Sequence, residues 1–461
     1  MSPSAMPLEF TTGSCDSRPR TLIEGIAARI PSRIKLATKL VAFHAKAPIH
    51  QLTVENILGG MRGAPSIVWE ISETDSSGVK YHGRTLRQLE EDLPKWGNSK
   101  QLSPEAMLWY LYTASVPTQA ELKQFAADLV SRCELPKDVT DFLDNLPVNL
   151  SPIVHMNMGL TVLAQHSKLM KALAKGARKE ELWKFALEDA LDATGRIPTL
   201  VARIHSNIYR QGCDRDATLD LSADLAQNFA IRMGRSCDIN FVELTRLAWV
   251  LHQDHGANVS AHTMRLVSSA LTDPYSTLSA GLIAGSGTLH AMAIHNSVDF
   301  NKNMTSALGP NPTDQDIENY VLKCIASGQI LPGYGHAVLR VVDPRLEWIY
   351  RFVADHPAPL PESGVHPVLL ELIQRANMIV PDLLRVHLPK IKNPAPNVDA
   401  LSGSTMHTYG LDVDFILPFM ACGRAMGFLA QSVWDKALGL PIERPLSITM
   451  DGLLAKLQSN A

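Results

Sequence analysis

The sequence has few charged residues and no excess of either sign. Charged residues make up 19% of the 461 positions, with 43 Lys and Arg against 46 Asp and Glu. A chain without a basic excess is not expected to bind nucleic acid or an anionic membrane surface. Hydrophobic residues make up 46%, which is typical of a globular protein with a large core. We therefore expect an anionic ligand to be held by a local arginine cluster.

Paired cysteines, long apolar runs and a clear targeting segment are also missing. The six cysteines include no C-x-x-C pair, which indicates free thiols in a reducing compartment. No stretch reaches the ~18 uninterrupted apolar residues of a membrane span. Arg18 and Arg20 suggest a mitochondrial presequence, but Glu9 and Asp16 interrupt it, and transit peptides contain few acids. We expect a cytoplasmic protein without membrane contact, while a mitochondrial location stays open.

Alternating strand patterns are rare, and helical periodicity dominates the chain. Apolar residues recur with helical spacing over 22–30, 160–173 and 241–251. The clearest strand covers 66–72, and a turn at 75–78 follows it, which predicts a short β-hairpin near the N-terminus. The predicted fold class is therefore mainly α, with one small hairpin.

Two regions differ in composition from the rest of the chain. Residues 260–300 are rich in small side chains, which let helices approach closely, so we expect deep core or a subunit interface there. From about residue 299 to 409 the chain becomes more polar and richer in proline. This change predicts a smaller lobe that moves separately.

One fifteen-residue segment, Leu331–Arg345, combines a glycine-rich turn with a histidine and two arginines. The Gly-Tyr-Gly turn lets backbone amides approach a ligand closely. His336 can transfer a proton near neutral pH. Arg340 and Arg345 can hold carboxylates or phosphates in a fixed geometry. The segment therefore predicts a site for an anionic substrate.

A second histidine group occurs in the sequence HQDHGANVSAH. The spacing of His252 and His255 places both on one helical face, so a metal site is one alternative. Gly256 indicates that the helix ends there, and capping or core histidines are the other alternative for His252 and His262. His255, beside the glycine turn, is the best candidate for a ligand-facing imidazole. We predict no bound metal.

His290, Asp399, Arg424 and Arg444 are further candidates, each ambiguous alone. His290 follows a glycine turn at the start of an apolar helix, where the helix dipole favours a neutral, hydrogen-bond-donating imidazole; a core histidine is the alternative. Asp399, in a proline-rich loop, is either a catalytic group or a helix cap. Arg424 on an apolar helix requires an anionic partner, whereas Arg444 could pair with Glu443 at the surface.

These motifs, in this order, resemble the citrate synthase family, most closely its eukaryotic mitochondrial type. They are HQDHGANVSAHT, GSGTLH, LPGYGHAVLRVVDPR, NPAPNVDALSG, CGRAMGFLAQ and ERPLSITMDGL. The resemblance implies an α-helical homodimer with shared active sites, whose small domain closes over the substrates. The expected parts are an N-terminal extension (1–20), a large domain (21–295 and 411–461) and a small domain (296–410). The resemblance also implies a reaction, the Claisen-type condensation of an acyl-CoA with oxaloacetate followed by hydrolysis of the thioester. The CoA thioester is then a co-substrate, and no cofactor is expected.

The resemblance further implies a role for each candidate residue. Asp399 resembles the base that deprotonates the carbon next to the thioester, His290 the donor to the thioester oxygen, and His336 the group that polarises the ketone. The oxaloacetate-binding positions are His255, Arg345, Arg424 and Arg444, the last of which reaches the site of the partner subunit. The CoA-binding positions are Leu331, Gly333, Tyr334, Gly335, Arg62, Arg178, Arg340 and Lys392.

The sequence departs from the family around the acyl group. Where the family usually has Gly-Leu-Ala-Asn-Gln-Glu after the histidine, this chain has Ala-Met-Ala-Ile-His-Asn, and Leu401 and Met420 replace a histidine and an aromatic residue. The candidate acyl pocket is Ala291, Ile294, Leu401 and Met420. Each methylene that meets an apolar wall contributes about 0.8 kcal/mol. We therefore expect a divergent acyltransferase of secondary metabolism that makes a 2-alkylcitrate from a longer acyl-CoA. The alternatives are a citrate or 2-methylcitrate synthase and a catalytically silent dimeric homologue.

Overall fold

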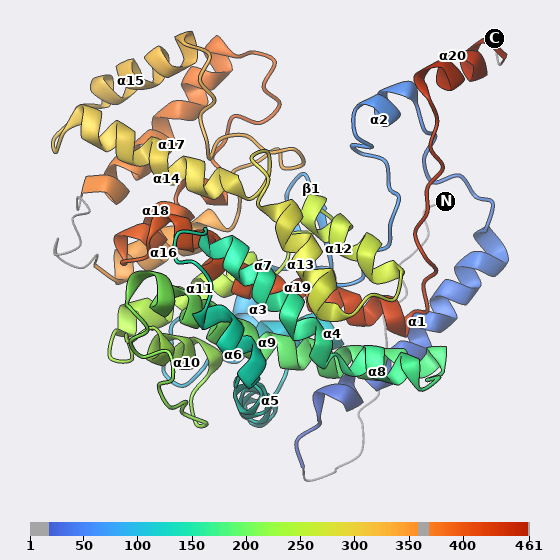
Figure 1. Cartoon of the computed structure of the whole chain (residues 1–461). Coiled ribbons are helices and arrows are strands. Elements are labelled where there is room, and N and C mark those ends of the chain that lie inside the picture. Colours follow the sequence, from blue (N-terminus) through green and yellow to red (C-terminus); the bar gives the residue numbers. More distant parts are fainter. Residues whose placement is uncertain (1–17, 358–367, 460–461) are drawn as a thin grey trace.

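The computed structural model describes residues 18–357 and 368–459 (Figure 1), so most of the expected N-terminal extension lies outside the described residues. The helices are α1 (Leu22–His44), α2 (Val54–Leu58), α3 (Leu86–Asp92), α4 (Pro104–Thr113), α5 (Gln119–Ser131), α6 (Lys137–Asp144), α7 (Pro152–Leu163), α8 (Lys168–Ala174), α9 (Leu182–Tyr209), α10 (Leu225–Arg232), α11 (Ile239–His252), α12 (Val259–Ser269), α13 (Pro274–Gly285), α14 (Met292–Leu308), α15 (Asp314–Ala326), α16 (Leu346–Asp355), α17 (Val368–His387), α18 (Ser402–Thr408), α19 (Val413–Ala437) and α20 (Met450–Ser459). The strands are β1 (Ser72–Asp75), β2 (Gly78–Tyr81) and β3 (Arg84–Thr85), and short 3-10 helices are η1 (Ala164–His166), η2 (Lys179–Glu181) and η4 (Val398–Ala400).

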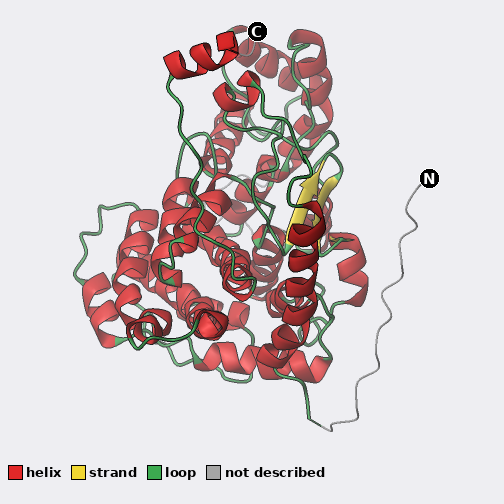
Figure 2. Ribbon diagram, turned by 90° about the vertical axis from the view of Figure 1, so that its right-hand side faces the viewer, coloured by secondary structure: helices red, strands yellow, loops and turns green. Residues whose placement is uncertain are grey.

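The prediction of a mainly helical fold with one small N-terminal sheet is confirmed (Figure 2). The strand order is β1-β2-β3, and both pairs are antiparallel. The turn between β1 and β2 lies where the sequence indicated, with Asp75 Oδ1 accepting a hydrogen bond from the backbone N–H of Ser77 (2.7 Å). This aspartate turn closes the hairpin without a proline.

The strand predicted over 66–72 was wrong, because β1 begins only at Ser72. Two residues of the expected strand form hydrogen bonds with distant parts of the chain. Trp69 Nε1 donates to Asp254 Oδ2 (3.2 Å), and the backbone N–H of Glu70 donates to Gln431 Oε1 (2.8 Å). These side-chain acceptors take the place of a neighbouring strand, so the segment connects the sheet to α19.

The helical stretch expected over 160–173 consists of two helices separated by η1. Ser167 begins the second of them, because its Oγ accepts a hydrogen bond from the backbone N–H of Met170 (3.1 Å). A serine in this position satisfies an otherwise unpaired amide of the first turn. The chain therefore changes direction at Ser167, which apolar spacing alone does not reveal.

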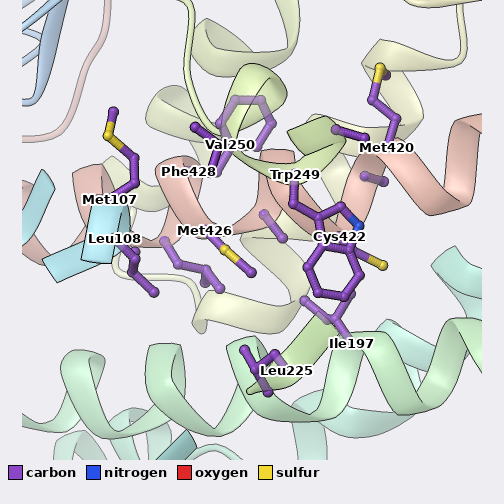
Figure 3. Packing of buried hydrophobic residues seen from close by; sticks show 14 of the residues in the cluster. Met107, Leu108, Ile197, Leu225, Trp249, Val250, Met420, Cys422, Met426 and Phe428 are labelled. Atoms are coloured by element: carbon purple, nitrogen blue, oxygen red, sulfur yellow. The ribbon is translucent and has the colours of Figure 1, made fainter. Parts of the chain in front are cut away.

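Helices α9 and α19 form the centre of the molecule, and α4, α7, α11, α12 and α13 pack against α19 (Figure 1). By length and composition α19 could cross a membrane, but 83% of its most apolar window is buried inside the structure. Figure 3 shows this interior, in which Trp249 of α11 lies beside Cys422 of α19. The indole Nε1 of Trp249 donates to the carbonyl of Phe419 (3.1 Å). Helix α19 is therefore the core helix.

Two glycines of α19 allow it to contact the end of α11. A Cβ on Gly423 would lie 2.6 Å from the carbonyl oxygen of Trp249, and one on Gly427 would clash with the carbonyl oxygen of Gln253. No larger side chain fits between these backbones without moving a helix. The glycines of CGRAMG thus set the distance between α19 and the loop that follows α11, and they flank Arg424.

Replacing Gly427 by alanine is expected to lower the free energy of unfolding by at least about 2 kcal/mol, because an added methyl group overpacks this contact. Thermal or denaturant unfolding measures the loss. Gly287→Ala is the control, since its Cβ would approach only the carbonyl of Ala284 at 3.4 Å. Equal stability of the two variants would contradict the close approach of α11 and α19.

A second apolar cluster lies apart from the main one. It joins α14, α15 and α17 through residues such as Phe300, Val321 and Leu372, and Figure 1 shows these helices at one side of the molecule. Residues of α16 and α18 pack instead on the main cluster. The division of the chain into domains at residues 295 and 411 stays a prediction.

Candidate active site

The candidate catalytic residues and most of the candidate oxaloacetate-binding residues come from five segments, with Arg424 near the middle of α19. They are the loop that follows α11, the loop between α13 and α14, the segment 331–345, η4 with the residues before it, and α19 itself. The rings of His255 and His336 lie edge to face with centroids 5.4 Å apart. The charges of Arg345 and Arg424 both act on Asp399. These five candidates therefore form one site.

The first turn of α12 fixes the tautomer of His290. Its Nε2 accepts hydrogen bonds from Ser260 Oγ (2.7 Å) and from the backbone N–H of Ser260 (3.3 Å). A neutral imidazole that accepts at Nε2 carries its proton on Nδ1. Burial, and then the charge of Arg424, lowers the pKa of His290. His290 is therefore a neutral Nδ1–H donor, and among the described residues its Nδ1 has no hydrogen-bond partner.

The Gly-Tyr-Gly turn is held against the loop that carries Asp399. The backbone N–H of Gly335 donates to the carbonyl of Ala395 (3.0 Å), and that of Asn397 donates to the carbonyl of Gly333 (2.9 Å). Gly333 has a φ of +85°, and a Cβ there would lie 2.5 Å from Ala400 Cα. Glycine is therefore required both for the backbone conformation and for the contact. Two segments about sixty residues apart in sequence form one rigid unit.

His336 has the tautomer opposite to that of His290. Its Nδ1 accepts hydrogen bonds from the backbone N–H groups of Val338 (3.0 Å) and Leu339 (2.9 Å). The proton of the neutral ring is therefore on Nε2. Burial, and then the charge of Arg345, lowers the pKa of His336. The neutral ring can therefore donate a hydrogen bond from Nε2 to a carbonyl oxygen.

Asp399 lies in η4, and Asn397 begins this turn by accepting the backbone N–H of Asp399 on Oδ1 (2.9 Å). Burial raises the pKa of Asp399 to about 6, although the charges of Arg345 and Arg424 act to lower it. A carboxylate with such a pKa binds a proton more strongly than an exposed one. Asp399 is thus suited to remove a proton near neutral pH.

Arg345 is bound by Asp343, which the sequence reasoning missed. Its Nη2 and Nε donate to Asp343 Oδ2 (2.7 Å) and Oδ1 (3.0 Å), and both side chains are buried. Asp343 Oδ2 also accepts the backbone N–H of Val398 (3.2 Å). Although burial acts to raise the pKa of Asp343, the charge of Arg345 holds it well below the usual range. The signal was the DPR tripeptide, in which the two charges are two residues apart.

A second buried carboxylate, Asp254, acts on Arg424. Its Oδ2 accepts hydrogen bonds from the side chains of Trp69 and Ser72 and from the backbone N–H of Gly256 (3.0 Å). Burial lowers the pKa of Arg424, and Asp254 is the carboxylate that most opposes this effect. Arg424 Nη1 is buried and has no hydrogen-bond partner among the described residues. An unpaired buried guanidinium is costly unless a ligand anion reaches it.

The alternatives left open for the other histidines are now decided. His252 is a core histidine, because it is buried, its Nδ1 bonds the carbonyl of Ala248 (2.7 Å) and burial lowers its pKa to about 3. His262 is exposed and pairs with Glu443. Within residues 18–357 and 368–459, no group of His, Cys, Asp or Glu could hold a metal ion. Asp254, which lies between His252 and His255 in the sequence, orders this loop through its hydrogen bonds to Trp69, Ser72 and Gly256.

The residues expected to bind CoA are not gathered in one place, unlike those expected to be catalytic. Leu331 is buried in the second apolar cluster, and Tyr334 donates its hydroxyl to Asn377 Oδ1 (2.8 Å). Arg340 Nη1 donates to the carbonyls of Leu339 (2.7 Å) and Val338. The exposed basic residues are Arg62, Arg178 and Lys392, and Arg178 pairs with Glu181. Their roles stay predictions.

Three of the four acyl-pocket candidates are core residues. Ile294, Leu401 and Met420 are all buried. A Cβ on Gly403 would lie 2.8 Å from Ile294 Cγ1, so this side chain is closely packed. Figure 3 shows the Met420 side chain directed away from Cys422. Ala291, just before α14, is half-buried.

Comparison with known proteins agrees with this geometry. The family model described as "Citrate synthase, C-terminal domain" matches residues 60–446. The mitochondrial 2-methylcitrate synthase of Fusarium solani is 40% identical over 93% of this chain and 90% of its own length. The peroxisomal citrate synthase of Saccharomyces cerevisiae is 39% identical over 95% and 94%, respectively. These names give no support to the cytoplasmic location expected from the sequence.

Two solved structures share the fold. Citrate synthase from Pyrobaculum aerophilum has a TM-score of 0.69 and 23% identity, covering 85% of this chain and 92% of its own. Citrate synthase from Thermoplasma acidophilum, solved with carboxymethyl coenzyme A and oxaloacetate, has a TM-score of 0.69 and 17% identity over 87% and 97%. With the family model and the curated relatives, they identify this chain as a member of the citrate synthase family.

Proposed function

We propose that this chain condenses a short acyl-CoA with oxaloacetate and hydrolyses the resulting thioester. The observation that carries the proposal is the set of opposite tautomers in one site. His290 offers an Nδ1–H, His336 offers an Nε2–H, and Asp399 has a pKa raised to about 6 by burial. Two neutral donors and one basic carboxylate are what a carbon–carbon condensation between two carbonyl compounds requires.

The first chemical step is enolisation of the acyl-CoA. Asp399 takes a proton from the carbon next to the thioester, while His290 donates from Nδ1 to the thioester oxygen as negative charge develops there. The carbon acid is weak, so neither group suffices alone. A donor aimed at a developing oxyanion contributes about 10²–10³-fold in comparable sites.

The second step joins this carbon to the ketone carbon of oxaloacetate. His336 donates a hydrogen bond from Nε2 to the ketone oxygen. The alkoxide that forms there takes up one proton, which balances the one that Asp399 removed, and becomes a hydroxyl group. Arg345, Arg424 and His255 hold the two carboxylates, and the orphaned Nη1 of Arg424 supports this role. Water then adds to the thioester carbon, and CoA leaves as the free thiol. Residues near the CoA phosphates would include Arg62, Arg340 and Lys392.

The acyl group is proposed to be acetyl or propionyl. The relatives named above are citrate and 2-methylcitrate synthases, and Ile294 is buried and packs closely against Gly403. Both facts favour the short chains over the longer alkyl chain expected from the sequence. One observation favours the alternative of a longer acyl chain, namely the apolar character of Leu401 and Met420.

A series of kcat/KM values with acetyl-, propionyl-, butyryl- and hexanoyl-CoA tests this assignment. Oxaloacetate-dependent release of free CoA is the readout. The proposal expects the highest value with acetyl- or propionyl-CoA and a fall for hexanoyl-CoA. A maximum at hexanoyl-CoA would establish the longer-chain alternative. No release with any thioester, in a folded protein that binds oxaloacetate, would indicate a catalytically silent homologue.

The acid limb of the pH profile is proposed to report Asp399. The carboxylate must be ionised to act as a base, so kcat/KM is expected to fall as pH decreases through about 6. Burial also holds the pKa values of His290 and His336 below the ordinary value of a histidine. Initial rates between pH 4.5 and 8 measure the limb. A limb near pH 4, the ordinary range of an aspartate, would contradict the role of burial.

We further propose that two copies of this chain form a homodimer with shared sites. Residues 440–449, which we call the C-terminal arm, run from α19 to α20 away from the helical body (Figure 1). Leu446 is 100% exposed and Ile442 63%. Exposed apolar side chains on an extended segment favour burial against another chain. Arg444, on this arm, would then reach the oxaloacetate of the partner.

An apolar groove supplies a second surface for this dimer. It lies between α7 and α13, has a volume of about 510 Å³ and includes Val154, Met158 and Ile283 in its lining. Ile283 is 57% exposed, on the small-residue segment expected to be core or interface. Sedimentation at micromolar concentration tests the dimer, and a monomer there would overturn it.

A further inference from the structure

The C-terminal arm is attached to helix α12 at one residue, Glu443. His262 Nε2 lies 2.6 Å from Glu443 Oε1, and the backbone N–H of Glu443 donates to Ser269 Oγ (3.0 Å). His262 and Ser269 are seven residues apart, or about two turns of helix. Glu443 is therefore fixed both through its side chain and through its backbone, and its side chain is 19% exposed.

Beyond this attachment the arm makes no polar contact with the body. Within the described part of the chain, residues 444–449 form no hydrogen bond or ion pair with any element other than α20. Pro445 restricts the backbone of Arg444 to extended conformations. The position of Arg444 relative to the body is consequently set by the contacts of Glu443.

The same helix orients His290. Ser260, in the first turn of α12, bonds His290 Nε2 through its hydroxyl and its backbone N–H. His262 follows two residues later and is exposed, whereas Ser260 is buried. Helix α12 thus contacts a catalytic histidine of its own chain on one side and carries the arm on the other.

We propose that His262 and Glu443 are positioning residues that fix Arg444 for the oxaloacetate site of a second copy. The proposal rests on the shared site described above. An arm released from α12 would keep Arg444 but would sample many positions, and ordering it again on binding would weaken the hold on the substrate. Such a loss affects substrate binding more than the chemical step, so it appears in KM and not in kcat.

The test compares steady-state constants of His262→Ala and Glu443→Ala at concentrations where sedimentation shows only dimer. Both variants are expected to raise KM for oxaloacetate by roughly three- to tenfold. We expect kcat and KM for the acyl-CoA to stay within about twofold of wild type, because no group that touches either substrate at the chemical step is removed. The double variant is expected to resemble the single ones, since each removes the same contact.

Two comparisons separate positioning from a general structural effect. His262→Gln can still donate to Glu443 and is expected to restore most of the affinity for oxaloacetate. Lys137→Ala removes an exposed ion pair with Asp141 on α6 and is expected to leave KM unchanged. A loss of dimer without a change in KM of the remaining dimer would mean that the pair is merely structural and would overturn the proposal.

Other outcomes also have a definite meaning. An unchanged KM in His262→Ala, or fully additive effects in the double variant, overturns the anchoring role. Failure of the shared site is recognised separately, because Arg444→Ala itself would then leave KM for oxaloacetate unchanged in a complete dimer. Failure of the proposed reaction would be seen in the wild-type protein, as CoA release that does not depend on oxaloacetate.

Discussion

Replacing Asp399 by asparagine is expected to lower kcat by about 10²–10⁴-fold, the range for loss of a general base. The amide has nearly the same shape but cannot accept the proton from the acyl carbon. Burial raises the pKa of Asp399 to about 6, so the native carboxylate is a stronger base than an exposed aspartate. KM for oxaloacetate should change little, because the residues proposed to hold that substrate are unaltered.

The control for this variant is the unfolding midpoint. Because burial makes the ionised form of Asp399 costly, a neutral amide should leave stability equal or slightly higher. A loss of turnover together with preserved folding and oxaloacetate binding assigns the effect to chemistry. Turnover within tenfold of wild type would contradict the role of Asp399 as the base.

Replacing His290 by alanine is expected to lower kcat by about 10²–10³-fold, the usual effect of losing one oxyanion donor. The ring is neutral and protonated on Nδ1, because Ser260 bonds Nε2 through both its hydroxyl and its backbone N–H. In the alanine variant, the enolate oxygen loses the hydrogen bond from Nδ1 that stabilises its negative charge. Rapid-quench or steady-state measurement of CoA release gives the loss.

Ser260→Ala provides the matched comparison for His290. This variant loses the hydroxyl but keeps the backbone N–H, so the tautomer should be retained and kcat should fall much less than in His290→Ala. A loss in Ser260→Ala as large as that in His290→Ala would mean that the hydroxyl acts on the substrate. That result would contradict the assignment of Ser260, on α12, as the residue that orients His290.

That the candidate residues lie together could be expected from the sequence, because they occur in short, distinctive patterns; their catalytic roles stay predictions. PGYGHAVLR carries His336 on a turn whose glycines are required by a φ of +85° at Gly333 and by the contact with Ala400. A backbone conformation that requires glycine can be recognised in the sequence from the glycine itself. The mainly helical fold was equally accessible, since apolar spacing reports buried helix faces.

The supporting contacts could not be predicted in the same way. Asp254 was visible in HQDHGANVSAH but received no role, because nothing in the sequence shows that Trp69 and Ser72 lie against it. The strand expected over 66–72 failed for the same reason, since its hydrogen-bonding partners are remote side chains. Pairings between distant segments depend on the packing of α11, α19 and the sheet, and not on local propensity.

The acyl preference could not be predicted correctly, because the sequence does not show which residues surround the candidate pocket residues. Apolar replacements at Ile294 and Leu401 suggested a longer chain, but both side chains are buried in the main core and Ile294 touches Gly403. A buried apolar residue that fills its own space offers no volume to a ligand. Substitution patterns alone therefore do not distinguish a wider pocket from a repacked core.

The fate of the acyl hydrogens tests the central claim most directly. Purified protein is incubated with oxaloacetate and acetyl-CoA carrying three deuterons on its methyl group, or propionyl-CoA carrying two on its α-carbon. Removal of one by Asp399 and attack by the enolate predict a citrate with two deuterons or a 2-methylcitrate with one, and one free CoA for each product. A product that keeps every deuteron, or CoA release accompanied only by the free acid, would contradict the condensation through an enol.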